Sequence, residues 1–210
     1  MKNRMVSIAG NIGIGKSTIT TLLSEKFGWK PYFEVVDTNP YLSDFYGEMR
    51  RWAFHLQVFF LSKRFKHHKE MISQNTTVIQ DRSIYEDVEI FAKNLYLKGQ
   101  FEERDYQNYK ELFSIMTSYL KPPDLLVYLR ASVPVLQKRI QTRGRSYELN
   151  IPKEYLEQLN EHYENWAEHY KKGPLLVIDT ENIDVVNSRE DFERVAGLIS
   201  EHLMMKQVLF

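Results

Sequence analysis

A segment near the start of the chain, residues 10–17, constrains the fold more than any other feature of the sequence. It reads Gly-Asn-Ile-Gly-Ile-Gly-Lys-Ser, follows a short apolar run at Met5–Ala9, and leads into a stretch with apolar residues at helical spacing. Glycines let backbone N–H groups converge on phosphate oxygens, and the start of a helix adds a partial positive charge. A plain glycine-rich turn is the alternative, but the strand and helix contexts on either side favour a phosphate-binding loop.

This loop predicts a nucleoside triphosphate, bound together with Mg²⁺, as a ligand. We expect Lys16 to reach the outer phosphates and the hydroxyl of Ser17 to ligate Mg²⁺. The residues expected to contact the donor run along the loop: Gly10, Asn11, Ile12, Gly13, Ile14, Gly15, Lys16, Ser17 and Thr18. The loop does not indicate which molecule receives the phosphate.

The composition excludes several classes of protein. The 210 residues suit a single domain, 1–210, with a sizeable core. A formal net charge of +0 gives no overall field to attract nucleic acid or an anionic membrane. The sequence has no cysteine, no apolar run of the roughly 20 residues that a membrane helix needs, and no room for a signal peptide before the first strand. We therefore expect a cytoplasmic enzyme with neither nucleic acid nor membrane as a partner.

Short apolar runs alternate with long helical patterns, which is typical of a parallel sheet flanked by helices. Strands are predicted at residues 5–9, 77–80, 125–129 and 175–178, with a weaker candidate at 31–36. Helices are predicted at residues 48–74, 84–98 and 153–171, and Ser188 is the expected N-cap of a last helix. The fold class is thus α/β, with a central parallel sheet of about five strands. Ligands of such sheets lie beyond the carboxyl ends of the strands.

Charged residues follow two of the predicted strands. Glu34 lies at the end of the weaker candidate, and Asp81 and Arg82 follow the strand at 77–80. A carboxylate at Asp81 suits a Mg²⁺ site, and Arg82 can stabilise charge on a transferred phosphoryl group. A solvated carboxylate and a surface ion pair are the alternatives. The position at a strand end favours a function for Asp81 and Arg82.

An arginine cluster surrounds a predicted helix end at Gly144. Arg139 and Arg143 are four residues apart and share a helix face, and Arg145 follows the glycine. We expect the three guanidiniums to converge in a mobile lid, about residues 139–150, that closes on the phosphates of ATP. A solvated basic helix end is the alternative.

These features together resemble a known family. The sequence carries Asp37-Thr38-Asn39-Pro40-Tyr41-Leu42, Arg51-Trp52-Ala53-Phe54-His55-Leu56-Gln57, and Gln80-Asp81-Arg82-Ser83-Ile84-Tyr85-Glu86-Asp87. With the phosphate-binding loop before them, these motifs follow the order of the deoxyribonucleoside kinases, and the resemblance covers essentially the whole chain. It is strongest to the bacterial deoxyadenosine/deoxycytidine kinase branch. It implies the P-loop kinase fold, a homodimer, and transfer of the γ-phosphate of ATP to the 5′-hydroxyl of a deoxynucleoside.

The resemblance also implies roles for single residues. Glu34 matches the carboxylate that hydrogen-bonds the 5′-hydroxyl and acts as general base, and Asp81 matches an acid at the Mg²⁺ site that is the alternative proton acceptor. Arg82 matches the arginine that contacts the 5′-oxygen. The expected catalytic residues are therefore Glu34, Asp81, Arg82 and Lys16.

The residues that contact the sugar are assigned by the same resemblance, and those that contact the donor adenine by their position in the fold. Tyr46 and Glu148 match the pair that binds the 3′-hydroxyl. Because Glu148 lies three residues after Arg145, closure of the lid is expected to be coupled to sugar binding. We place the contacts to the donor adenine in the loop after the last strand, around residues 180–184.

Recognition of the base is expected from residues on two helices. Gln57 matches an amide that pairs with the base edge, and one amide fits either adenine and cytosine or, turned over, thymine and guanine. Arg64 lies two helical turns further on, and with Asp87 it resembles the Arg/Asp pair of the cytidine- and purine-type kinases. An ionised Asp87 only accepts hydrogen bonds, which favours a base with an exocyclic amine over thymine. Phe91 matches an aromatic ring that stacks on the base, with core packing as the alternative.

We predict ATP-dependent phosphorylation of deoxyadenosine, deoxycytidine or both in nucleotide salvage. A deoxyguanosine kinase of the same family is an alternative. A thymidylate-type monophosphate kinase is disfavoured, because Glu34 repels a phosphorylated acceptor unless further arginines lie nearby, and the sequence shows none. A GTPase switch is disfavoured because this sequence has no Asn-Lys-x-Asp motif. A non-catalytic relative is disfavoured because the sequence retains Lys16, Glu34 and Arg82.

Overall fold

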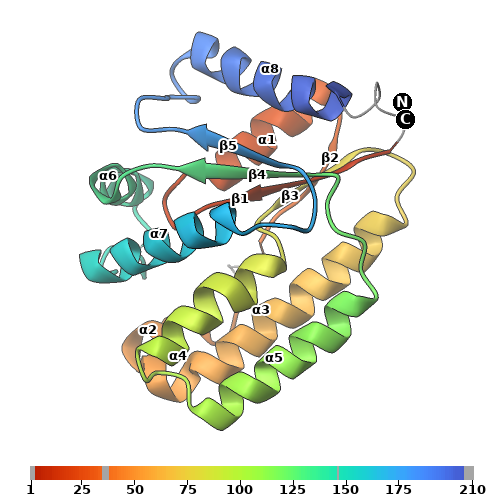
Figure 1. Ribbon diagram of the computed structural model, residues 1–210. Helices are drawn as coiled ribbons and strands as arrows, with labels where there is room; N and C mark the ends of the chain where they lie inside the picture. The colour runs from red at the N-terminus through yellow and green to blue at the C-terminus, as the bar shows by residue number, and fades with distance from the viewer. Residues whose placement is uncertain (1–2, 35–37, 146, 206–210) are drawn as a thin grey trace.

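A parallel sheet of five strands forms the centre of the structure, a computed structural model that describes residues 3–34, 38–145 and 147–205 (Figure 1). In sheet order the strands are β2 (Lys30–Tyr32), β3 (Val78–Asp81), β1 (Met5–Ala9), β4 (Leu125–Arg130) and β5 (Leu175–Asp179). All of their pairings are parallel. The predicted α/β fold class with about five parallel strands is confirmed.

The strand boundaries differ from the predicted ones by small amounts. The strand at 5–9 is confirmed, and the next three each extend one residue further at the carboxyl end, to Asp81, Arg130 and Asp179. Asp81 is therefore the last residue of β3 rather than the first residue after it. The weak candidate at 31–36 forms a strand only over Lys30–Tyr32, and residues 35–37, including Asp37 of the first family motif, lie outside the described residues.

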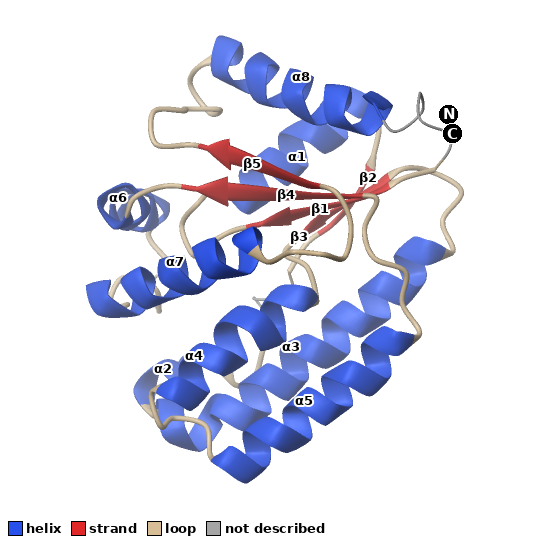
Figure 2. Ribbon diagram, in the orientation of Figure 1, coloured by secondary structure: helices blue, strands red, loops and turns tan. Residues whose placement is uncertain are grey.

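Two layers of helices cover the sheet, because alternate residues of each strand point to opposite faces. On β4, Leu125, Val127 and Leu129 join the core under α1 (Lys16–Phe27) and α8 (Arg189–Met205), whereas Leu126 and Tyr128 join the core on the other face. That second face is covered by α3 (Met49–Ile72), α5 (Glu103–Ser118) and α7 (Lys153–Glu168). Figure 2 shows these helix layers on both sides of the strands.

The remaining helices are shorter than those of the two layers. They are α2 (Leu42–Gly47), the π-helix η1 (Asp87–Ala92), α4 (Lys93–Leu97) and α6 (Val133–Arg143). The helices predicted at 48–74 and 153–171 are confirmed as α3 and α7 within three residues at each end. Among the described residues, no helix has both the length and the apolar character needed to cross a membrane.

The helix predicted at 84–98 is confirmed over residues 85–97, but its middle part, η1, has π rather than α geometry and leads directly into α4. A π-helix bonds residue i to i+5 and therefore turns its side chains away from ordinary helical spacing. Hydrophobic periodicity does not report this difference in so short a segment. The expected cap of α8 is confirmed, since the backbone N–H of Asp191 donates to Ser188 Oγ at 3.1 Å.

Candidate active site

One cavity of about 1110 Å³ extends from the phosphate-binding loop to α3 and η1. The loop follows β1, and Ile8 near the end of β1 pairs with Asp81 at the end of β3, so the strand ends bring loop and acid together. The cavity wall contains every residue expected at the acceptor: Glu34, Tyr46, Gln57, Arg64, Asp81, Arg82, Asp87, Phe91 and Glu148. Tertiary structure thus gathers side chains that are spread over more than 100 residues of sequence.

The phosphate-binding loop has the backbone that its glycines predict. Gly10, Gly13 and Gly15 have φ angles of 145°, 82° and 99°, which side chains disfavour. A Cβ on Gly10 would lie 2.6 Å from the carbonyl oxygen of Leu129, so only glycine fits there. Lys16 is buried and its Nζ donates to the carbonyl oxygens of Gly10 and Asn11, at 2.9 and 3.0 Å. Burial, with the nearby charge of Arg82, lowers the pKa of Lys16 to about 8.

Asn11 points away from the cavity. Its Nδ2 donates to the carbonyl of Leu156 at 2.9 Å and to Asn160 Oδ1 at 2.7 Å, both on α7. Its Oδ1 accepts from the N–H of Ile12 at 2.7 Å. The Asn11 side chain therefore fixes the loop to α7, while Ile12 through Thr18 line the cavity.

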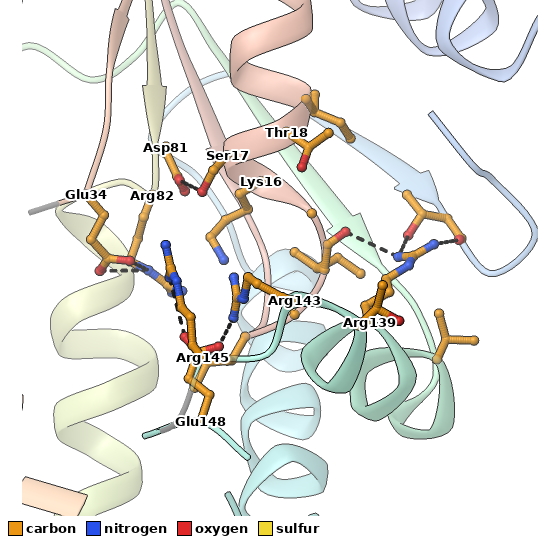
Figure 3. A pocket seen from close by; sticks show the side chains of 18 of the residues that line it. Lys16, Ser17, Thr18, Glu34, Asp81, Arg82, Arg139, Arg143, Arg145 and Glu148 are labelled. Atoms are coloured by element: carbon orange, nitrogen blue, oxygen red, sulfur yellow. Dashed lines mark hydrogen bonds and ion pairs between the residues drawn. The ribbon is translucent and has the colours of Figure 1, made fainter. Parts of the chain in front are cut away.

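Ser17 and Asp81 form the candidate Mg²⁺ site. Ser17 Oγ donates to Asp81 Oδ2 at 2.5 Å, as Figure 3 shows. The other oxygen, Oδ1, is buried with no hydrogen-bond partner among the described residues. Burial raises the pKa of Asp81, although Lys16 opposes the shift. One carboxylate beside one hydroxyl fits Mg²⁺, which keeps several waters and takes further ligands from phosphates.

Glu34 contacts two guanidiniums, and Figure 3 shows the one of Arg82. Arg82 Nε approaches the two carboxylate oxygens of Glu34 at 3.3 and 3.4 Å, and Arg64 Nη2 contacts Oε1. Burial alone would raise the pKa of Glu34, but Arg82 and Arg64 outweigh it and lower the pKa to about 2. Glu34 is therefore ionised and ready to accept a hydrogen bond from a hydroxyl.

Arg64 continues this chain of charges toward the expected base-reading residues. Its Nη1 lies 2.5 Å from Asp87 Oδ1, and both side chains are buried. Burial raises the pKa of Asp87 to about 7 against the opposing charge of Arg64. Asp87 Oδ2 and Gln57 Oε1 are buried acceptors with no partner among the described residues. Two acceptors thus remain free for a ligand.

Arg82 is held in an unusual backbone conformation. Its φ of 68° is the only positive value at a non-glycine position in the described parts of the chain, and such a conformation costs about 1–3 kcal/mol. Its guanidinium lies 4.5 Å from the centre of the Phe91 ring, a cation–π contact. Phe91 therefore both lines the cavity and supports Arg82.

The three arginines of the expected lid do not converge, which corrects the prediction. Arg139 points away from the other two (Figure 3) and donates to the carbonyls of Ile14, Thr180 and Ile183 at 3.2, 2.8 and 3.0 Å. It connects the phosphate-binding loop to the loop expected at the donor adenine. Two residues four apart share only part of a helix face, and a long side chain turns toward the nearest free carbonyls.

Arg143 and Arg145 instead meet at Glu148 (Figure 3). Arg143 Nη2 contacts Glu148 Oε2, and Arg145 Nη1 lies 3.5 Å from Oε1. Burial raises the pKa of Tyr46 well above its usual value, and the nearby negative charge of Glu148 adds to that shift. Residue 146, within the expected lid, lies outside the described residues.

Sequence reasoning missed two residues of this site, Glu86 and Tyr163. Both side chains are fully buried, and both hydrogen-bond Arg82. An acid four residues after an arginine is a signal for a helical ion pair at Glu86. Nothing in the sequence distinguishes Tyr163 from the other apolar-face residues of α7.

Comparison with known proteins gives consistent matches. The family described as "Deoxynucleoside kinase" matches residues 6–204. A Bacillus subtilis (strain 168) protein named deoxyadenosine/deoxycytidine kinase is 40% identical over 201 residues, which cover 95% of this chain and 93% of that protein. A deoxyguanosine kinase of the same organism is 36% identical over 204 residues, covering 93% and 96%.

A solved structure shares the architecture. The deoxyadenosine kinase from M. mycoides, with the products dCMP and a flexible dCDP bound, superposes with a TM-score of 0.83. It is 32% identical and covers 94% of this chain and 99% of its own. A second structure of that kinase, with bound dATP, has the same TM-score at 30% identity.

Proposed function

The chain belongs to the deoxynucleoside kinase family and is a phosphotransferase, and we propose that it transfers the γ-phosphate of ATP to the 5′-hydroxyl of deoxyadenosine and deoxycytidine. One observation carries the proposal. A single cavity has the phosphate-binding loop at one end and the buried chain Glu34–Arg64–Asp87 at the other. A hydroxyl placed at Glu34 therefore lies between a triphosphate site and a base-reading site.

The acceptor end supplies the groups that the transfer needs. Glu34, ionised between Arg82 and Arg64, accepts a hydrogen bond from the 5′-hydroxyl and takes its proton as the new bond to phosphorus forms. The bond from the γ-phosphorus to the bridging oxygen breaks in the same transfer, and ADP leaves with that oxygen. Phosphoryl transfer has a loose transition state in most analyses, so positioning and charge stabilisation matter more than a strong base. Arg82 lies next to Glu34 and stabilises the charge that develops on the transferred group. Asp81 remains the alternative proton acceptor.

The donor end binds the triphosphate of ATP. The backbone from Ile12 to Thr18 and the Nζ of Lys16 face the phosphates, and Arg143 and Arg145 approach them from the lid. Ser17 and Asp81 would hold Mg²⁺, which when bound neutralises the charge between the β- and γ-phosphates. By its resemblance to the family motif, Glu148 would hold the sugar 3′-hydroxyl. Glu148 also pairs with both lid arginines, so the same carboxylate would take part in sugar binding and in holding the lid.

The free acceptors in the cavity support the preference for amine-bearing bases. Asp87 Oδ2 accepts from the exocyclic amine of adenine or cytosine, and the Gln57 amide pairs with the same edge. Phe91 lines the cavity beside them and is available to stack on the base. Relatives named deoxyguanosine kinase keep guanine as the alternative base.

The thymidylate-type alternative remains disfavoured, but for a revised reason. The expectation that Glu34 has no further arginine nearby is wrong, because the fold places Arg64 in contact with Glu34. Both guanidiniums are nevertheless already compensated. Arg64 and Arg82 face three carboxylates, those of Glu34, Glu86 and Asp87, which leaves no surplus positive charge for a phosphate dianion.

The decisive experiment compares kcat/KM for the four deoxynucleosides and their ribonucleoside counterparts, each with Mg·ATP. We expect deoxyadenosine and deoxycytidine to exceed thymidine by at least about tenfold. The parallel measurement with thymidine monophosphate as acceptor tests the monophosphate-kinase alternative. Turnover of the monophosphate without turnover of any nucleoside would overturn the proposal.

Three further properties belong to the same proposal. We propose one domain, since one sheet contains strands from both ends of the chain, and a cytoplasmic location. We also propose a homodimer. The large exposed apolar side chains Leu112 and Ile115 lie on α5, Tyr119 caps its C-terminal end, and α5 packs beside α3. Light scattering after gel filtration tests this, with Ile115→Lys expected to give monomers.

A further inference from the structure

The carboxylate of Glu86 contacts both Gly10 of the phosphate-binding loop and Arg82, although Glu86 does not line the cavity. It is 0% exposed and precedes η1. Its Oε1 accepts from the backbone N–H of Gly10 at 3.3 Å, from Arg82 Nη1 at 3.3 Å and from the hydroxyl of Tyr163 at 2.7 Å. Its Oε2 accepts from the N–H of Ser83 at 2.6 Å. A buried carboxylate with this many donors is fixed in one orientation.

On the acceptor side, Glu86 fixes the guanidinium that contacts Glu34. Arg82 uses Nε for Glu34 and Nη1 for Glu86, so it is held between two carboxylates. Nη1 also donates to the Tyr163 hydroxyl at 2.7 Å, which closes a triangle with Glu86. The bond from Ser83 N–H to Glu86 holds the backbone directly after Arg82, where φ is 68°. Glu86 therefore stabilises both the side chain and the strained backbone of Arg82.

On the donor side, Glu86 fixes the first peptide of the phosphate-binding loop. The N–H of Gly10 donates to Glu86, while the carbonyl of Gly10 accepts from Lys16 Nζ at 2.9 Å. When Lys16 turns toward a bound triphosphate, the Gly10 carbonyl loses that donor and the loop depends on its remaining contacts. The contact to Glu86 connects this loop to Arg82 through a single carboxylate group.

We propose that Glu86 is a positioning residue that couples the donor loop to Arg82, so that a bound triphosphate aligns Arg82 at the 5′-hydroxyl. The inference rests on the proposed function, because it needs a triphosphate at one end and a hydroxyl at the other. It assigns Glu86 no contact with substrate. Its effect is transmitted through Gly10 and Arg82, as a supporting residue acts through the groups that it orients.

The test compares Glu86→Gln with wild type and with Glu89→Gln. Gln keeps the shape of Glu86 but loses the charge and places an amide donor against either Arg82 or the N–H of Ser83, whereas Glu89, on η1, is exposed and controls for the loss of an acidic charge. We expect E86Q to lower kcat by at least about tenfold, with KM for ATP and deoxyadenosine within about threefold of wild type. We expect E89Q to match wild type.

A binding measurement separates positioning from simple stabilisation. Calorimetry gives the Kd of deoxyadenosine with and without a non-hydrolysable ATP analogue, and the ratio of the two values is the coupling factor between the sites. We expect the analogue to tighten deoxyadenosine binding in wild type and to change it less in E86Q. A merely structural role lowers Tm and leaves both kcat per folded molecule and the coupling factor at wild-type values, which would overturn the inference.

A second variant covers the case in which E86Q does not fold. Tyr163→Phe keeps the carboxylate and its charge but removes the hydroxyl that bonds both Arg82 and Glu86, so a smaller loss of kcat and of coupling is expected. Unchanged kcat and coupling in that variant would contradict the inference. Wild-type turnover of the deoxynucleosides is measured first. Its absence refutes the proposed function, whereas normal turnover with an unaffected E86Q refutes only the role of Glu86.

Discussion

Arg64 and Asp87 form a buried ion pair in which Nη1 lies 2.5 Å from Oδ1. The second amino group of the same guanidinium contacts Glu34, the expected proton acceptor. One arginine thus connects the residue proposed to read the base to the residue proposed to bind the 5′-hydroxyl. Changes at Asp87 are therefore expected to affect selectivity first, and changes at Arg64 to affect both selectivity and rate.

Selectivity between deoxyadenosine and thymidine is expected to depend on pH. The pKa of Asp87 is raised to about 7, so the carboxyl becomes neutral as the pH falls through that value. The neutral form donates a hydrogen bond, which suits the O4 of thymine, whereas the ionised form accepts from an amine. We expect the ratio of kcat/KM for deoxyadenosine to that for thymidine to rise from pH 6 to pH 8. The Asp87→Asn variant should give a ratio that does not change with pH.

Removal of the base-reading pair is expected to relax selection. In the double variant Asp87→Ala with Arg64→Met, the acceptor that disfavours O4 is lost together with its buried partner, which avoids an unpaired charge. Thymidine kcat/KM should rise at least severalfold relative to deoxyadenosine. Absolute rates should fall, because Glu34 loses one of its two guanidiniums. An unchanged ratio in competition assays would contradict the assignment of these residues.

Replacement of Glu34 tests the expected base. Glu34→Ala leaves the phosphate-binding loop intact but removes the hydrogen-bond acceptor for the 5′-hydroxyl, so kcat should fall by about 10²-fold or more. ATP affinity, measured by calorimetry, should stay within a few fold. Glu34→Gln keeps the shape and separates loss of charge from loss of volume. Near-normal turnover in either variant would transfer the role of proton acceptor to Asp81.

The lysine of the phosphate-binding loop is expected to limit ATP capture at alkaline pH. Its pKa in the free protein is about 8, because burial disfavours the charged form, compared with 10.5 for an exposed lysine. The value of kcat/KM for ATP reports on the free enzyme and should fall above pH 8 as Lys16 loses its proton. At saturating ATP, kcat should stay level to higher pH, since the phosphates stabilise the charged lysine. A plateau of kcat/KM up to pH 10 would contradict this.

Substitutions of Arg139 and of Arg143 are expected to change different kinetic constants. Arg139 bonds carbonyls on both sides of the donor site, so Arg139→Ala should raise KM for ATP several-fold with kcat within about threefold of wild type. Arg143 lies in the cavity wall with a carboxylate partner, so Arg143→Ala should lower kcat by at least about tenfold. Equal effects of the two substitutions would restore the original expectation of a converging lid.

Local sequence information was enough for the parts of the site that depend on local chemistry. The backbone of residues 10–17 follows from its glycines, and the carboxylate–hydroxyl pair follows from Asp81 at the end of β3 and Ser17 in the first turn of α1. The strand at 5–9 was predicted without error because a buried parallel strand is a continuous apolar run. Side chains on long flexible stems were predicted less well, as Arg139 shows.

By itself, the sequence determined the α/β fold class and the phosphate-binding loop, because each depends on short-range patterns. It predicted the acceptor residues through the family resemblance, and the structure places those residues in one cavity wall. The tertiary structure alone decided the partners of the buried charges. Arg64 joins Asp87 and Glu34, which lie 23 and 30 residues away in sequence, and Glu86 joins Gly10, 76 residues away, to the nearby Arg82. Buried charges must find compensating charges wherever the fold places them. Spacing along the chain does not encode those distances, so only the folded structure shows which carboxylate faces which guanidinium.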